Sequence, residues 1–138
     1  MNLKTELLNF KEGITLESGE RLDSFDLQIE TYGEINKEGS NAILICHAFS
    51  GNHHAAGQSN DFGIGWWDQI IGPNKAIDTE KYFVVCCNNL GGCAGSTGPT
   101  SINPTTQKVY GKSFPIVSVD DWVNSQKMLM DKLNIDFW

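Results

Sequence analysis

The chain has 138 residues, enough for one domain with a modest core, and its composition of 40% hydrophobic and 20% charged residues is ordinary for a globular protein. The net charge of −7 and the isoelectric point of about 4.8 argue against nucleic acid or an anionic membrane as a partner. No stretch is long and apolar enough for a membrane span, and the N-terminus lacks the apolar segment of a signal peptide. We therefore expect a cytoplasmic protein.

The cysteines are expected to be structural. Cys86 and Cys87 are neighbours in a predicted strand, so their side chains point to opposite faces, which argues against a shared metal or a mutual disulfide. No two cysteines form a C-x-x-C pair. We interpret all four, including Cys46 and Cys93, as small buried apolar residues in a reducing compartment.

The first predicted unit is a β-hairpin. Residues 9–16 and 21–32 have the composition of strands, and Gly19 lies in the turn between them. Apolar and polar residues mostly alternate along the second segment. This alternation is typical of an outer antiparallel strand with one solvated face.

Two apolar runs predict buried strands of a mostly parallel sheet. Residues 42–46 are apolar at every position, which indicates a central strand with both faces covered. Residues 82–87 form a second such run, rich in β-branched and aromatic side chains. Between them we expect a short helix near residues 67–71, ended by Gly72 and Pro73.

One longer helix is predicted over residues 119–133. Ser118 is a favourable N-cap, and Asn134 can end the helix. Residues 100–115 before it are expected to be irregular but ordered, because they contain aromatics and prolines. The order of hairpin, strand, helix, strand and helix predicts the front part of a doubly wound α/β sheet. The apolar face of the helix is expected to contain Val119, Trp122, Val123, Leu129, Met130 and Leu133.

Residues 86–99, after the second buried strand, contain glycines at positions 91, 92, 95 and 98. A strand that ends in such a loop is where α/β proteins usually place a ligand site. We expect the loop to lie beside residues 47–51, which follow the first buried strand. The glycine-rich loop lacks the lysine and the following helix of a phosphate-binding loop. A purely structural turn remains the plainer alternative.

The histidines predict no metal site. His53 and His54 are adjacent, which rarely directs both rings to one metal, and no acidic or cysteine ligand lies at suitable spacing. His47 ends a buried strand. Its plainer role is a hydrogen bond to the following turn, and the alternative is that it lines the site.

Neither serine near these loops is predicted to be a nucleophile. Ser96 lies in A-G-S-T-G, close to the G-x-S-x-G elbow, but Pro99 follows almost at once and no helix does. Ser50 lacks the flanking glycines. Residues 47–51 instead suit the loop that supplies one N–H of an oxyanion hole in α/β-hydrolases, an N–H that lowers the barrier by about 3–4 kcal/mol.

Several segments together resemble a known family: 41–51, 65–68, 71–73, 82–85, 89–99, 101–104, 110–111 and 114–115. They resemble the N-terminal part of the homoserine O-acetyltransferase family, acyltransferases of the α/β-hydrolase fold. The resemblance runs from near Leu16 to the end, and other α/β-hydrolases do not share the run 89–99. Phe49 stands where leucine is usual, and Gln107 where glycine is usual.

The resemblance implies that residues 1–138 form the N-terminal portion of one α/β-hydrolase domain, an antiparallel hairpin leading into a mostly parallel sheet with flanking helices. It implies a ping-pong reaction in which a serine takes the acyl group from acyl-CoA and L-homoserine takes it from the enzyme, a step towards methionine. Of the catalytic groups, only the Phe49 backbone N–H carries over, as an oxyanion-hole donor. The triad Ser, Asp and His would lie beyond this chain.

The resemblance further implies acyl-CoA as co-substrate, no bound cofactor or metal, and homodimers of the intact proteins. The 138-residue chain alone is expected to be inactive, and unstable because its buried strands would lack partners. Two alternatives stay open: an esterase of the same fold, and a non-enzymatic truncated product. The residues do not distinguish an acetyl from a succinyl donor.

Overall fold

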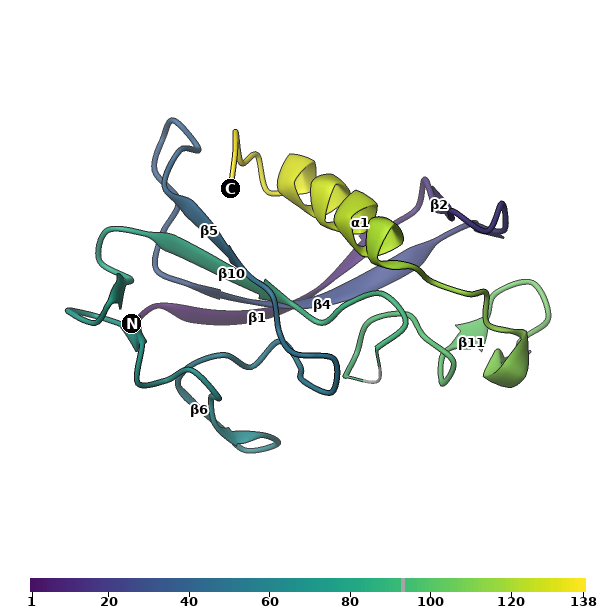
Figure 1. Ribbon diagram of the computed structural model, residues 1–138, viewed down its shortest axis with the longest axis horizontal. Coiled ribbons are helices and arrows are strands. Elements are labelled where there is room, and N and C mark those ends of the chain that lie inside the picture. Colours follow the sequence, from purple (N-terminus) through teal and green to yellow (C-terminus); the bar gives the residue numbers. More distant parts are fainter. Residues whose placement is uncertain (93) are drawn as a thin grey trace.

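The computed structural model describes residues 1–92 and 94–138. Its centre is a four-stranded sheet of order β1-β4-β10-β5 (Figure 1). β4 pairs antiparallel with β1 and with β10, whereas β10 and β5 are parallel. The predicted α/β class is confirmed, with an antiparallel hairpin leading into a mixed sheet. The strands are β1 (Leu3–Phe10), β4 (Phe25–Tyr32), β5 (Ala42–Ile45) and β10 (Phe83–Cys87).

The hairpin begins earlier than predicted. β1 starts at Leu3 and pairs with the whole of β4, and a separate two-residue ladder joins β2 (Ile14–Thr15) to β3 (Arg21–Leu22). The strands are interrupted near Gly13, where a Cβ would lie 2.3 Å from the Leu22 carbonyl oxygen. The sequence pattern missed the start of β1 because most of this strand is exposed and carries a weak apolar signal.

The interpretation of β4 as an outer strand is wrong. β4 lies between β1 and β10, and its last four residues, 29–32, are all buried. The face that carries Glu30 and Tyr32 is covered by Ala55 and Ala56, which are fully buried. Polar residues on this face therefore lie inside the protein rather than in solvent.

Of the two apolar strands, both predicted to be buried, only β10 is central in the described sheet, and the predicted central position of residues 42–46 is wrong there. β10 is central and its Cys86 and Cys87 are buried in opposite cores, as predicted. Burial raises the pKa of both thiols, that of Cys87 to about 12. β5 lies at the edge of the described sheet, its two middle residues are partly exposed, and Cys46 is exposed, because only β10 pairs with this strand. Cys93 lies outside the described residues.

The sheet separates two hydrophobic cores. Helix α1 (Val119–Lys132) covers one face, and the segment containing β6 (Gln58–Ser59) and β7 (Gly63–Ile64) lies on the other (Figure 1). The first core is larger and joins the hairpin to α1, whereas the second lies under residues 55–77. Burial on both faces is the main contribution to holding these segments in place.

Helix α1 begins after its predicted N-cap, Ser118, and ends next to Asn134, which has a positive φ of 54°. Its buried face differs from the predicted one. Val119 and Val123 are exposed, whereas the helix buries Leu129 together with two polar residues, Asp121 and Ser125. Trp122, Met130 and Leu133 are partly buried against the first core, as the apolar periodicity predicted.

No helix forms at residues 67–71. The chain instead makes a turn in which the Ile70 and Ile71 N–H groups both donate to the Trp67 carbonyl, and Ile71 then enters β8. A parallel pairing of β8 (Ile71–Gly72) with β9 (Ile77–Asp78) competes with helix formation here. The apolar pattern was too short to distinguish these structures.

Residues 100–115 are ordered, as predicted, and they contain a small hairpin. β11 (Ile102–Asn103) pairs with β12 (Lys108–Val109), and a 3-10 turn (Gly111–Ser113) follows. Gln107 closes this hairpin with a φ of 57°, a conformation that favours glycine.

Gln107→Gly is expected to stabilise the protein modestly. Glycine adopts the left-handed backbone conformation without the steric cost of about 1–2 kcal/mol that other residues incur. Its greater conformational freedom in the unfolded chain offsets about 0.4–1 kcal/mol of that gain. Thermal unfolding should show a small rise in melting temperature. Thr106→Gly, one residue earlier and without a positive φ, should instead lower it; a fall for both variants would contradict the strain argument.

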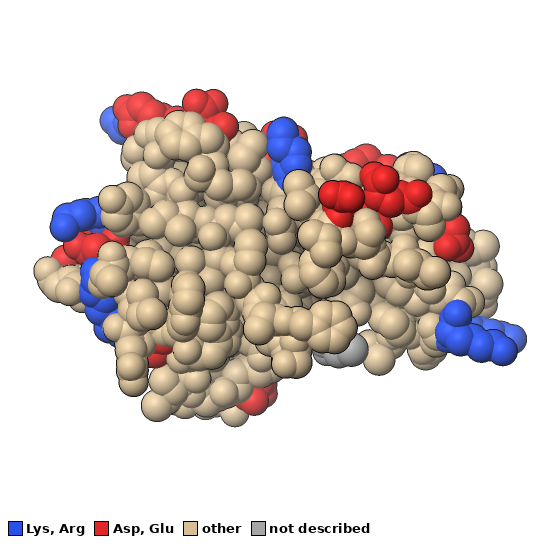
Figure 2. Space-filling view, in the orientation of Figure 1, with Lys and Arg blue, Asp and Glu red and all other residues tan. Residues whose placement is uncertain are grey.

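Figure 2 shows that the middle of one face carries few charged side chains, and that acidic and basic groups gather near its margins. Within residues 1–92 and 94–138, no helix has the length and apolar character needed to cross a membrane.

Candidate active-site loops

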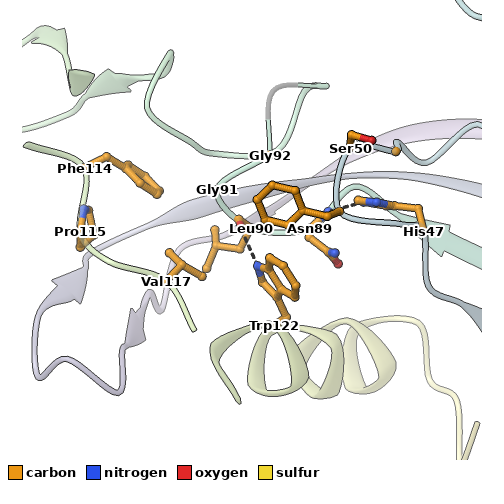
Figure 3. A pocket seen from close by; sticks show the side chains of 12 residues that line it. His47, Ser50, Asn89, Leu90, Gly91, Gly92, Phe114, Pro115, Val117 and Trp122 are labelled. Atoms are coloured by element: carbon orange, nitrogen blue, oxygen red, sulfur yellow. Dashed lines mark hydrogen bonds between the residues drawn. The ribbon is translucent and has the colours of Figure 1, made fainter. Parts of the chain in front are cut away.

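A cavity of about 530 Å³ opens where β5 and β10 end. Because these strands are parallel, their carboxyl ends meet at the same edge of the sheet, and the two loops that follow them lie side by side as predicted. Figure 3 shows side chains from both loops and from α1 around this space. The lining residues are His47, Phe49, Ser50, Gly51, Asn89, Leu90, Gly91, Gly92, Phe114, Pro115, Val117 and Trp122.

The glycine-rich loop continues the hydrogen bonding of β4 beyond the end of β10. The Ser96 hydroxyl accepts from the Gln28 N–H at 2.9 Å and donates to the Asn88 carbonyl. The Thr97 hydroxyl accepts from the Asp26 N–H at 2.8 Å, and the Thr97 N–H returns a bond to the Asp26 carbonyl. Ser96 is therefore buried and fully paired, which agrees with its rejection as a nucleophile.

The glycines of this loop permit close packing. A Cβ at Gly92 would lie 2.6 Å from the Asn88 side-chain oxygen, and one at Gly98 would lie 2.6 Å from the Gly92 carbonyl oxygen. Gly95 has a φ of 103° and leaves no room for a Cβ beside Gln28. These contacts support the plainer interpretation of the loop as a structural turn, whose first residues form one wall of the cavity.

His47 connects the two loops. Its Nδ1 lies 2.7 Å from the Ala48 carbonyl oxygen, and its Nε2 lies 3.1 Å from the Asn89 backbone nitrogen (Figure 3). A carbonyl accepts and an N–H donates, so the ring is the neutral tautomer with its proton on Nδ1. Both proposed roles of His47 hold: it bonds the turn and it lines the cavity. With both nitrogens engaged, it does not serve Ser50 as a general base.

The Phe49 backbone N–H donates to no described residue, and Phe49 as a whole residue is 93% exposed. The preceding carbonyl, of Ala48, accepts the Gly51 N–H at 2.7 Å in a tight turn. Phe49 thus lies beside the cavity with an available donor. Its role in an oxyanion hole stays a prediction.

The opposite wall of the cavity is apolar, and the sequence pattern did not find it. Leu90, Val117 and Trp122 lie together there (Figure 3). The Trp122 indole N–H donates to the Leu90 carbonyl at 2.8 Å, which ties α1 to the segment after β10. Helical periodicity places Trp122 only on the core face of α1, because periodicity cannot distinguish a core residue from one at the edge of a cavity.

A buried polar cluster lies on the other face of the sheet. The Glu30 carboxylate is 2.9 Å from His54 Nδ1, and it accepts from the Tyr32 hydroxyl at 2.6 Å and from the Thr5 hydroxyl at 3.2 Å. His54 Nε2 faces the Gly63 carbonyl at 3.1 Å. An ionised carboxylate and a doubly protonated ring satisfy every one of these contacts. Burial, followed by the bond to Glu30, raises the pKa of Tyr32.

The two adjacent histidines do not share a site. Both ring nitrogens of His54 are engaged with protein acceptors, whereas the buried His53 ring packs edge-on against Phe62 with centroids 5.4 Å apart. Burial lowers the pKa of His53. Over the described ranges, no group of three or more His, Cys, Asp or Glu side chains is arranged to hold a metal ion.

Comparison with known proteins finds relatives that align with nearly the whole of this chain. The chain is 61% identical over 135 residues to a homoserine O-succinyltransferase from Hahella chejuensis, an alignment that covers 96% of this chain and 35% of that protein. The chain spans about a third of the length of the curated relatives it matches. No family model matches the chain.

The chain is also similar to part of several proteins of known structure. The crystal structure of homoserine O-acetyltransferase from Bacillus anthracis matches with a TM-score of 0.86 and 41% identity, over 98% of this chain and 38% of that one. The crystal structure of an esterase matches with a TM-score of 0.87, also at 41% identity, over 97% of this chain and 38% of that one. The resemblance is confirmed: this chain is similar, over nearly its whole length, to part of the homoserine O-acyltransferases, and its mixed sheet is part of an α/β-hydrolase fold.

Proposed function

We propose that this chain is the N-terminal portion of a homoserine O-acyltransferase, which moves an acyl group from acyl-CoA to the hydroxyl of L-homoserine and releases CoA. The observation that carries the proposal is the 61% identity that extends over 96% of the chain. The cavity at the ends of β5 and β10 supports it, because α/β proteins bind ligands at this edge of the sheet.

The chain contributes a hydrogen-bond donor and a cavity wall to the reaction. A serine from outside these 138 residues attacks the thioester carbonyl, and the negative charge that develops on its oxygen is stabilised by the Phe49 N–H. The tetrahedral intermediate collapses, the C–S bond breaks, and the thiolate leaves as CoA after taking a proton. The homoserine hydroxyl then attacks the acyl-serine carbonyl, and the same N–H stabilises the second oxyanion. When this intermediate collapses, the ester bond to the serine breaks, the serine oxygen regains a proton from the homoserine hydroxyl, and O-acyl-L-homoserine leaves.

The apolar wall formed by Leu90, Val117 and Trp122 limits the access of water to the acyl-serine. An acyltransferase needs this protection, because water competes with homoserine for the same intermediate. The names of two curated relatives, at 59% and 61% identity, support succinyl-CoA as the donor, and the name of a solved homoserine O-acetyltransferase at 41% identity supports acetyl-CoA. No bound cofactor, a homodimeric assembly and a cytoplasmic location belong to the same proposal.

An esterase is the second candidate, favoured by the equal likeness to a solved esterase. The same donor and cavity would then stabilise the attack on a simple ester, and water would take the place of homoserine. The two functions differ in their dependence on CoA thioesters and on homoserine.

The proposal is tested by a chimaera in which these 138 residues replace the matching segment of the Hahella chejuensis relative. We expect homoserine-dependent release of CoA from succinyl-CoA or acetyl-CoA, within about tenfold of the parent enzyme. Hydrolysis of a simple ester without homoserine-dependent CoA release would instead support the esterase.

The 138-residue chain by itself is expected to give no turnover in the same assay, because an oxyanion donor without a nucleophile has nothing to stabilise. A loss of at least about 10⁴-fold relative to the chimaera follows from the size of nucleophile deletions in serine enzymes. Acyl transfer by the purified chain alone would show that the nucleophile lies within it.

A further inference from the structure

We propose that His47 is a positioning residue, which orients the Ala48–Phe49 peptide so that the Phe49 N–H faces the cavity. This inference rests on the proposed function, because it assigns that N–H a role in stabilising an oxyanion. The inference concerns how the Phe49 N–H is oriented, and not which N–H is the donor.

The orientation of this peptide is set through its carbonyl. The Ala48 oxygen accepts two hydrogen bonds, from His47 Nδ1–H at 2.7 Å and from the Gly51 N–H at 2.7 Å. In a trans peptide the C=O and the following N–H point in opposite directions. With the carbonyl held inside the turn, the Phe49 N–H must point out of it, and no described residue accepts it.

The other ring nitrogen fixes the turn relative to the cavity. His47 Nε2 accepts the Asn89 N–H at 3.1 Å, from the segment after β10 whose next residues, 90–92, form another part of the lining. The imidazole is therefore a rigid bridge between the two loops (Figure 3). Without it, the turn would keep only its internal Gly51 bond, and the peptide could rotate relative to the site.

Gly51 is an independent sign of this arrangement. A Cβ at position 51 would lie 3.0 Å from His47 Cβ and 3.3 Å from Nδ1, closer than ordinary van der Waals contact. A side chain here would push the ring away from the Ala48 carbonyl. The absence of a side chain at 51 therefore allows the ring to lie against the turn.

The test uses the active chimaera, in which this chain supplies the loops and the relative supplies the nucleophile. His47→Ala is expected to lower kcat by about 10- to 100-fold with a KM change below about threefold, because a misdirected oxyanion donor weakens the transition state and not substrate binding. His47→Asn places an amide N–H near the position of Nδ1 and should recover much of kcat. His47→Gln reaches Asn89 but not the Ala48 carbonyl, and should recover little.

Two further variants distinguish a positioning role of His47 from a nonspecific loss of folding or activity. Gly51→Ala displaces the His47 ring without removing any of its atoms, so it should reproduce the loss in kcat and keep the inference testable if His47→Ala fails to fold. Glu6→Gln, at an exposed position of β1 that does not line the cavity, should leave kcat within twofold.

The outcomes are distinguishable. An unsubstituted chimaera without acyl transfer would overturn the proposed function. An active chimaera in which His47→Ala and Gly51→Ala both keep kcat, or in which Gln recovers activity and Asn does not, would overturn the positioning role alone.

Discussion

Glu30→Leu is expected to lower the free energy of unfolding by about 3–5 kcal/mol, the usual result of removing one partner from a buried ion pair. The side chains of Glu30 and His54 are only 4% and 1% exposed. The substitution would leave the His54 ring and the Tyr32 hydroxyl facing an apolar side chain, without the carboxylate that accepts from both. Chemical denaturation of the chimaera measures the change.

Glu6→Gln is the matched control for this prediction. Glu6 lies on β1, next to the strand that carries Glu30, but it is exposed, so the loss of its charge should change stability by less than about 0.5 kcal/mol. Replacing both members of the pair, as in Glu30→Leu with His54→Phe, should recover part of the loss, because no charge remains buried without a partner. A Glu30 variant as stable as the Glu6 variant would show that the cluster contributes little.

Asp121→Ala is expected to cost about 2–4 kcal/mol, because one buried carboxylate holds together two distant parts of the chain. Asp121 is 0% exposed. One of its oxygens accepts the Glu17 N–H at 2.8 Å, from the turn of the N-terminal hairpin, and the other accepts the Ser118 N–H at 2.8 Å and its hydroxyl at 3.0 Å. The substitution removes the Asp121 half of the capping box and the tie to the hairpin together, whereas the Ser118 hydroxyl can still accept the backbone N–H of residue 121.

Asp120→Ala distinguishes the stabilisation by these hydrogen bonds from the effect of a negative charge near the start of the helix. Asp120 is adjacent, exposed, and equally close to the positive end of the helix dipole, so its removal should cost only about 0.3–1 kcal/mol. Hydrogen exchange should show faster opening at Glu17 and at the first turn of α1 in the Asp121 variant only. Equal effects of the two substitutions would mean that charge alone, and not the three hydrogen bonds, accounts for the stabilisation.

The sequence alone was sufficient where the governing interactions are local. Ser118 caps α1 through contacts within three residues, so its position predicts the start of the helix. Cys86 and Cys87 lie in opposite cores because side chains alternate along any strand. The juxtaposition of residues 47–51 with the glycine-rich loop followed from two apolar runs, since parallel strands end at one edge of the sheet.

The sequence alone was insufficient where a distant segment determines the environment of a residue. β4 has the alternation of an outer strand, yet residues 55 and 56 bury its polar face and place Glu30 in a cluster with His54. The buried Asp121 of α1 accepts a hydrogen bond from the backbone of Glu17, 104 positions away. No local pattern carries this information.

The sequence by itself determined the fold class, the second buried strand, the long helix and the similarity to homoserine O-acyltransferases. The reason is that hydrophobic periodicity, caps and contiguous motifs are properties of short segments. Only the tertiary structure decided that His47 bridges two loops, that the Ala48 carbonyl is held in a turn and that the Phe49 N–H is left available. These features depend on the direction of individual peptide groups, which is set when separate loops pack against each other.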